Sequence, residues 1–123
     1  MLTQFANFFV AMMAVLHAYI LVLEMFLWTT PRGRRAFGTT KEFAEASKTL
    51  AANQGLYNGF LAAGLVWGLT LGPAGQGAKL FFLGCILVAG LYGGATVGRK
   101  ILFIQAIPAA IAIALVLAAA AAA

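Results

Sequence analysis

Residues 17–35 read His-Ala-Tyr-Ile-Leu-Val-Leu-Glu-Met-Phe-Leu-Trp-Thr-Thr-Pro-Arg-Gly-Arg-Arg. The stretch places a histidine, His17, and a glutamate, Glu24, inside an apolar helix that then ends at a proline and three arginines. An ionisable group at membrane depth costs roughly 2.5 to 3.5 kcal/mol on insertion scales, so it needs a partner, a proton or a functional role. An apolar helix with a basic end predicts a membrane span that stops at a cytoplasmic surface.

The whole chain is too apolar for a water-soluble domain. Of its 123 residues, 63% are hydrophobic and 9% are charged, which leaves too little polar surface for a soluble fold of this length. A span needs ~20 apolar residues, and stretches of about this kind cover residues 5–28, 50–71, 80–97 and 101–122. Because lipid offers the backbone no hydrogen bonds, these stretches are expected to be helices. The sequence predicts an all-α integral membrane protein, one domain (residues 1–123) built as a bundle of four transmembrane helices.

The placement of lysine and arginine predicts the orientation. Five of these residues lie in the loop 29–49, Arg99 and Lys100 lie between the third and fourth stretches, and Lys79 alone lies between the second and third. The positive-inside rule therefore places the loop 29–49 in the cytoplasm and both termini outside. The net charge of +5 follows mostly from this topology, so nucleic acid is not expected as a partner. We expect a multi-pass protein of the plasma membrane, with the lipid bilayer as its partner.

The cytoplasmic loop is expected to begin as irregular chain. Pro31 ends the first helix, and Gly33 and Gly38 favour turns. Thr39 and Glu42 have the spacing of a capping box, which predicts that a helix starts there and continues into the second span. The three arginines are either anchors that fix the topology or binders of an anionic substrate.

Polar side chains gather in the cytoplasmic half of the predicted bundle. His17 and Glu24 are seven residues apart and fall within about 20° of each other on a helical wheel. Two neighbouring rows at the start of the second span, Gln54 with Asn58 and Asn53 with Tyr57, are expected to point into the bundle. The expected pocket opens to the cytoplasm and binds a ligand through Glu24, Asn53, Gln54, Tyr57, Asn58, Tyr92, Arg99 and Gln105. The alternative is that these amides only form hydrogen bonds between helices.

Two of these groups are candidates for chemistry. Glu24 and His17 could each act as an acid or a base, and Arg99 is the natural counter-charge that would keep Glu24 ionised. One histidine with one buried glutamate does not make a metal site, and the lone Cys85 has no intrachain disulfide partner. The outer turn Gly-Pro-Ala-Gly-Gln-Gly is assigned no chemistry, the outer half of the bundle is expected to be nearly bare of polar groups, and the sequence names no cofactor.

Three runs of sequence carry a resemblance to a known family. They are His-Ala-Tyr-Ile-Leu-Val-Leu-Glu-Met-Phe-Leu-Trp-Thr-Thr-Pro-Arg-Gly, Ala-Ala-Asn-Gln-Gly-Leu-Tyr-Asn-Gly-Phe-Leu-Ala-Ala-Gly and Gly-Arg-Lys-Ile-Leu-Phe-Ile-Gln. Nearly the whole chain resembles a family of small bacterial four-span proteins known as domain of unknown function 1304. The resemblance implies an integral protein of the bacterial inner membrane and no assigned reaction.

Two working hypotheses and a simpler alternative follow. In size and topology the chain is similar to the trimeric membrane glutathione transferases, which suggests an enzyme or a binding protein for a small amphipathic molecule. Their Arg-x-x-x-Asn-x-x-Glu pattern is absent, because Lys48 lies five residues before Asn53 and Leu56 replaces the glutamate. The chain is also similar in size to multidrug exporters that use one membrane glutamate, in which case it needs a homo-oligomer, and Glu24 exchanges a proton for a cation between aromatic walls. The simpler alternative is a structural protein in which the polar groups only join helices.

Overall fold

The structure is a computed structural model that describes residues 1–123, and it is built from helices alone. Their order along the chain is α1 (Leu2–Met25), α2 (Pro31–Phe37), α3 (Lys41–Thr70), the 3-10 helix η1 (Gly72–Gly75), α4 (Gln76–Thr96), the π-helical turn η2 (Leu102–Ala106) and α5 (Ile107–Ala122). The absence of strands confirms the all-α prediction.

Three helical segments are long and apolar enough to cross a membrane. They are Leu2–Met25, Gly72–Thr96 and Leu102–Ala122, which overlap the first, third and fourth predicted spans. All but the last residue of the predicted second span (50–71) lies within α3, a helix of 30 residues. That helix is long enough to cross, but its amide side chains at positions 53, 54 and 58 lower the mean hydropathy of the segment.

The helices form two compact units. Unit 1 comprises Met1–Ala14 and Ala63–Ala123, and unit 2 comprises Val15–Ala62. Helices α1 and α3 each contribute residues to both units. Helices α4 and α5 belong to unit 1, and α2 belongs to unit 2.

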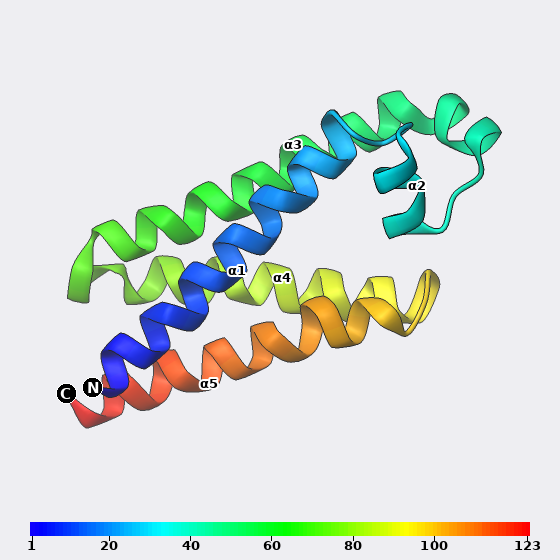
Figure 1. Ribbon diagram of the computed structural model, residues 1–123. Coiled ribbons are helices and arrows are strands. Elements are labelled where there is room, and N and C mark those ends of the chain that lie inside the picture. Colours follow the sequence, from blue (N-terminus) through cyan, green and yellow to red (C-terminus); the bar gives the residue numbers. More distant parts are fainter. The chain divides into compact units, whose positions relative to one another are not determined.

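Unit 1 depends on close packing of α4 against α5, which run side by side (Figure 1). Gly90 of α4 allows the close approach of η2, which directly precedes α5, because a Cβ atom there would lie 2.8 Å from the backbone nitrogen of Ala106. The apolar residues buried in this part of the unit are Leu83, Ile86, Ala106, Ala109, Ala112 and Val116. Both chain termini lie at the same end of unit 1 (Figure 1).

A π-helical turn interrupts the last helical segment. We expect an irregularity near Gln105 and Pro108, because proline has no N–H to donate to the helix ladder. The structure places the turn, Leu102–Ala106, directly before α5, where Pro108 is the second residue. Gln105 Nε2 donates to the carbonyl oxygen of Ile86 on α4 at 3.3 Å, so the turn also ties α5 to its neighbour.

The loop between α1 and α3 corrects the prediction of irregular chain. Its residues 31–37 form the helix α2. The prediction that Pro31 ends the first helix is wrong, because α1 already ends at Met25. Pro31 starts α2 instead, since its missing N–H is not needed in a first turn. Thr30 caps the helix by accepting from the backbone N–H of Gly33, and Gly38 ends it in the left-handed conformation with φ 67°.

The start of α3 corrects the predicted capping box by one residue. The capping residue is Thr40, whose Oγ1 accepts from the backbone N–H of Phe43 at 3.1 Å, and the helix begins at Lys41. Thr39 therefore does not pair with Glu42 as a capping box. Two adjacent threonines offer equivalent side chains, and the spacing to Glu42 favoured the wrong one.

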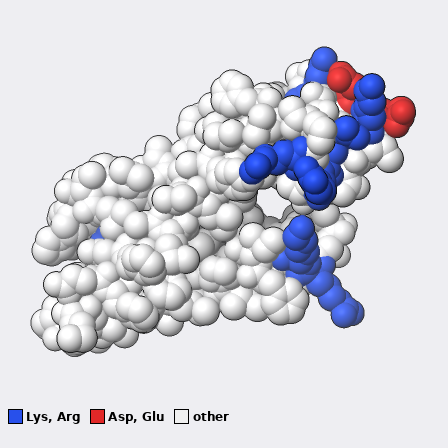
Figure 2. All heavy atoms as spheres, in the orientation of Figure 1, with Lys and Arg blue, Asp and Glu red and all other residues white.

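Large apolar side chains cover the outside of the helices, while charged side chains gather in a few places. Among the exposed residues are Phe8, Phe60, Phe81, Val88, Leu91, Ile111 and Leu117. In unit 2, the exposed Lys, Arg and Glu side chains gather at the end formed by α2 and the start of α3 (Figure 2). Apolar side chains on the outside of long helices are typical of surfaces that face lipid.

The packing at Gly90 yields a stability prediction. Gly90→Ala forces α4 and α5 apart, and overpacking of this kind costs about 1–3 kcal/mol. Gly84→Ala is the matched control on the same helix, because a Cβ atom at Gly84 meets nothing within 4 Å. Thermal unfolding in detergent should show a lower midpoint for Gly90→Ala alone. Equal midpoints for the two variants would show that the helices do not pack at this position.

Candidate functional site

The Glu24 carboxylate is buried near the end of α1. The side chain is 5% exposed. The Nδ2 atom of Asn58 on α3 donates to Glu24 Oε1 at 2.6 Å, and the same nitrogen donates to the carbonyl oxygen of Gln54 at 3.1 Å. The carboxylate therefore has a neutral partner that is itself fixed to its own helix.

A glycine lets the two helices meet at this point. A Cβ atom at Gly55 would lie 3.0 Å from the Cβ of Glu24 and 2.7 Å from the Cγ of Met25. Any larger residue would therefore push α3 away from the end of α1. Because a short amide such as Asn58 has little reach, the hydrogen bond to Glu24 depends on this close approach.

The other predicted residues of unit 2 have different surroundings. His17 is fully buried, as expected for the face that it shares with Glu24. Asn53 and Gln54 are exposed, and the amide of Asn53 donates back to the Thr49 carbonyl oxygen of its own helix. Tyr57 is 63% exposed, with its ring against Phe60. The expectation that both amide rows point inward is therefore wrong for Asn53, Gln54 and Tyr57.

Three predicted binding residues belong to unit 1. Tyr92 is 71% exposed and Arg99 is exposed, while Gln105 is half-buried in its bond to α4. The pairing of Arg99 with Glu24 stays a prediction. Two cavities stand out in the structure, and neither is lined by a residue of the predicted Glu24 pocket.

The arginines of α2 form a shallow polar surface in unit 2. Arg32, Arg35 and Ala36 line an open hollow of about 400 Å³, and Arg32 donates to the hydroxyl of Tyr19 at 3.4 Å. The helix is positioned by Trp28, whose ring lies 4.9 Å from that of Phe37 and whose indole N–H donates to Ser47. All the walls of this hollow come from one short helix, and the two alternatives for the arginines both stay predictions.

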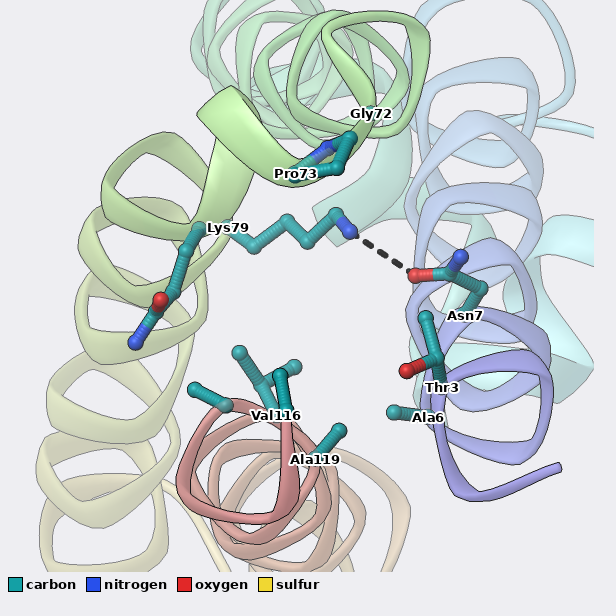
Figure 3. Close-up of a pocket in the computed structure, with 11 residues that line it drawn as sticks. Thr3, Ala6, Asn7, Gly72, Pro73, Lys79, Val116 and Ala119 are labelled. Carbon is teal, nitrogen blue, oxygen red and sulfur yellow. Dashed lines mark hydrogen bonds between the residues drawn. The ribbon is translucent and has the colours of Figure 1, made fainter.

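The second cavity, of about 330 Å³, lies in unit 1 at the end that holds both termini (Figure 3). Lys79 of α4 reaches across it, and its Nζ donates to Asn7 Oδ1 of α1 at 2.8 Å. From the sequence, no binding site was assigned to this end of unit 1 and no chemistry to the turn before α4. One signal was present, because Lys79 is the only charged residue between positions 49 and 98.

Comparison with known proteins places the chain in a family. Residues 11–117 match the model of DUF1304, described as a protein of unknown function. The chain belongs to the DUF1304 family. It is also 35% identical over 89 residues to the uncharacterized protein YpaA of Lactococcus lactis subsp. lactis (strain IL1403), a match that covers 71% of this chain and 75% of the relative. No solved structure matches.

Membership of DUF1304 confirms the resemblance seen in the sequence and brings no reaction with it. The matched region includes both sides of the Glu24–Asn58 hydrogen bond and the lysine of the unit 1 cavity, whereas Asn7 lies before it. The structure brings no three His, Cys, Asp or Glu side chains together. The buried polar or charged side chains are His17, Glu24 and Lys79.

Proposed function

We propose that the chain is a four-span protein of the bacterial inner membrane that binds a small amphipathic molecule at Glu24. In this proposal α3 is the second of four spans, both termini lie outside, and α2 with its arginines lies on the cytoplasmic surface. Support for α3 as a span comes from its length, because 30 residues rise about 45 Å at 1.5 Å per residue, more than a bilayer core of about 30 Å. The extra length fits its charged first turns outside the lipid.

The observation that carries the proposal is the buried Glu24–Asn58 hydrogen bond. If this contact served only to join helices, two amides would do so without burying a carboxylate. An ionisable residue inside a span is expensive and points by default to a functional site. Asn58 donates to only one of the two carboxylate oxygens, and a ligand that donates hydrogen bonds or carries a positive charge can use the other.

The surroundings of Glu24 suggest the shape of the ligand. Tyr57 and Phe60 present a pair of exposed rings on α3, next in sequence to Asn58 and its amide neighbours. An aromatic surface on the helix that supplies the partner of the carboxylate suits a molecule with an apolar body and a cationic or hydrogen-bonding head. Asn53 and Gln54 remain proposed contacts of this ligand, and His17 with Glu24 remains the proposed acid and base if the ligand is converted. Tyr92, Arg99 and Gln105 of unit 1 stay predicted binding residues.

A proton-coupled transporter is the second candidate. The observation that favours it is the neutral partner of Glu24, since a carboxylate held by an amide can give up a cation and accept a proton without breaking an ion pair. Four helices are few for a pathway, so this function requires a homo-oligomer of parallel chains. The exposed polar side chains of Asn53, Gln54 and Tyr57 would then find partners at the interface.

The topology can be tested with a matched pair of cysteines. In a Cys85→Ser background, Ala36→Cys and Ala74→Cys place one thiol on each side of α3, at exposed positions. A maleimide that cannot cross the membrane should label Ala74→Cys in intact cells and Ala36→Cys only after permeabilisation. Labelling of both from the same side would show that α3 does not cross the membrane.

Ligand binding can be tested on protein purified in detergent. Mass spectrometry should find a small molecule that co-purifies with the wild type, and Glu24→Gln should reduce its occupancy at least about tenfold, the loss expected for a charge-assisted hydrogen bond. The glutamine keeps an oxygen for Asn58, so the thermal unfolding midpoint should change little.

The control for this experiment is Glu45→Gln, which removes an exposed carboxylate paired only with Lys48 at 3.3 Å. This variant should keep the ligand. Proton-driven uptake of the same molecule into liposomes would favour the transporter, and a chemically altered molecule would favour an enzyme. An unchanged ligand content in Glu24→Gln would contradict the proposal.

A further inference from the structure

The cavity of unit 1 holds a lysine in an unusual place. Lys79 is 7% exposed, and the structure gives its ammonium group one hydrogen bond, to the neutral amide oxygen of Asn7. An ammonium group has three N–H donors, so two remain for other acceptors. A buried cation with a single neutral partner is costly unless an anion accompanies it.

The chain supplies no side-chain anion at this site. Its three acidic residues, Glu24, Glu42 and Glu45, all belong to unit 2, so unit 1 contains no Asp or Glu. The position of Lys79 in its helix also disfavours an unpaired positive charge. It is the fourth residue of α4, which starts at Gln76, and the N-terminal turn of a helix favours negative charge and disfavours a cation. Burial and the helix dipole thus both favour a negative charge close to Lys79.

The lysine is seated by the packing of its neighbours. A Cβ atom at Gly68 of α3 would lie 2.8 Å from the Cγ of Lys79 and 3.1 Å from its backbone nitrogen. The stem of Lys79 therefore lies against α3 where only glycine fits, and its head is directed across the cavity toward α1 (Figure 3). The placement of the ammonium group follows from helix packing and not from free rotation of an exposed side chain.

The lining of the cavity has two kinds of surface. Thr3, Asn7 and Lys79 (Figure 3), together with Gln76, supply polar groups. Ala6, Val116 and Ala119 (Figure 3), together with Ala120 and Ala123, supply apolar surface, and Gly72 and Pro73 complete the lining. The volume of about 330 Å³ is at the small end of the range for ligand sites, about 300–1,000 Å³. It is large enough for one anionic group and the first part of an apolar chain.

We propose that this cavity binds an amphipathic anion, with a phosphate head against Lys79 and the α4 N-terminus and an apolar chain along the alanine and valine wall of α5. Lysine is a common phosphate ligand that acts as a point charge, and the first turn of a helix adds N–H donors. The phosphate can belong to an anionic phospholipid or to a free alkyl phosphate. The site lies in unit 1 and does not depend on the function proposed for Glu24 in unit 2.

The test uses the full chain in nanodiscs of phosphatidylcholine, with two probes. Phosphatidylglycerol is measured by native mass spectrometry of retained lipid, and dodecyl phosphate by saturable binding. Saturable binding of either probe supports the site, and the preference between them distinguishes a lipid from a free phosphate. Lys79→Gln should weaken binding at least about tenfold, as expected for loss of a charge-assisted hydrogen bond. The exposed control Lys100→Gln should bind as the wild type does.

A second variant keeps the test informative if Lys79→Gln fails to fold. Asn7→Asp replaces the amide that accepts a hydrogen bond from Lys79 with a carboxylate. The variant therefore supplies an anion from the chain itself. This variant should unfold at a higher temperature than the wild type and lose binding of both probes. Wild-type protein that binds neither probe more tightly than a neutral dodecyl detergent would overturn the proposal. Undiminished binding in Asn7→Asp or in a folded Lys79→Gln would do so as well.

Discussion

The hydrogen bond from Asn58 to Glu24 expresses the constraint on which the rest of this protein depends. For an apolar helix, packing against another helix and packing against lipid differ little in free energy, because both surroundings are hydrocarbon. A polar group removes that freedom, because it must meet a partner that lipid cannot supply. Glu24 therefore specifies which face of α1 meets α3, and the 2.6 Å bond to Asn58 specifies the register.

Glycine makes each polar contact geometrically possible. Gly55 brings α3 against α1 beside Glu24, and Gly68 brings α4 against α3 beside Lys79. Both polar contacts use asparagine, whose short side chain reaches a partner only across closely packed helices. Gly90 likewise brings α4 against η2, beside the hydrogen bond from Gln105 to the Ile86 carbonyl oxygen. Helix packing and polar recognition are thus two aspects of one arrangement in each unit.

The sequence predicted the helical class and the burial of Glu24 because both follow from composition and the cost of charge in lipid. It did not select Asn58 over Gln54 as the partner, because a helical wheel gives the faces of one helix and not the position of its neighbour. Asn53 and Gln54 were expected inside for the same reason and are exposed. Local rules also failed where two choices were nearly equal, as with Thr39 and Thr40 at the start of α3.

Lys79 was overlooked for a different reason. Counting it as a loop charge under the positive-inside rule required the third span to begin at residue 80, whereas α4 begins at Gln76 and places Lys79 inside the helix. Considered by itself, Asn7 is typical of an amide at the membrane interface. Only their contact, between residues 72 positions apart, reveals the site.

The most direct test of the account is a solid-state NMR measurement on labelled protein in lipid bilayers. It asks whether the side-chain carboxyl carbon of Glu24 is dipolar-coupled to the side-chain amide nitrogen of Asn58. The account predicts a strong cross peak between these two sites, as the 2.6 Å contact requires. A Glu24 carboxyl that correlates with water and shows no coupling to Asn58 would contradict it.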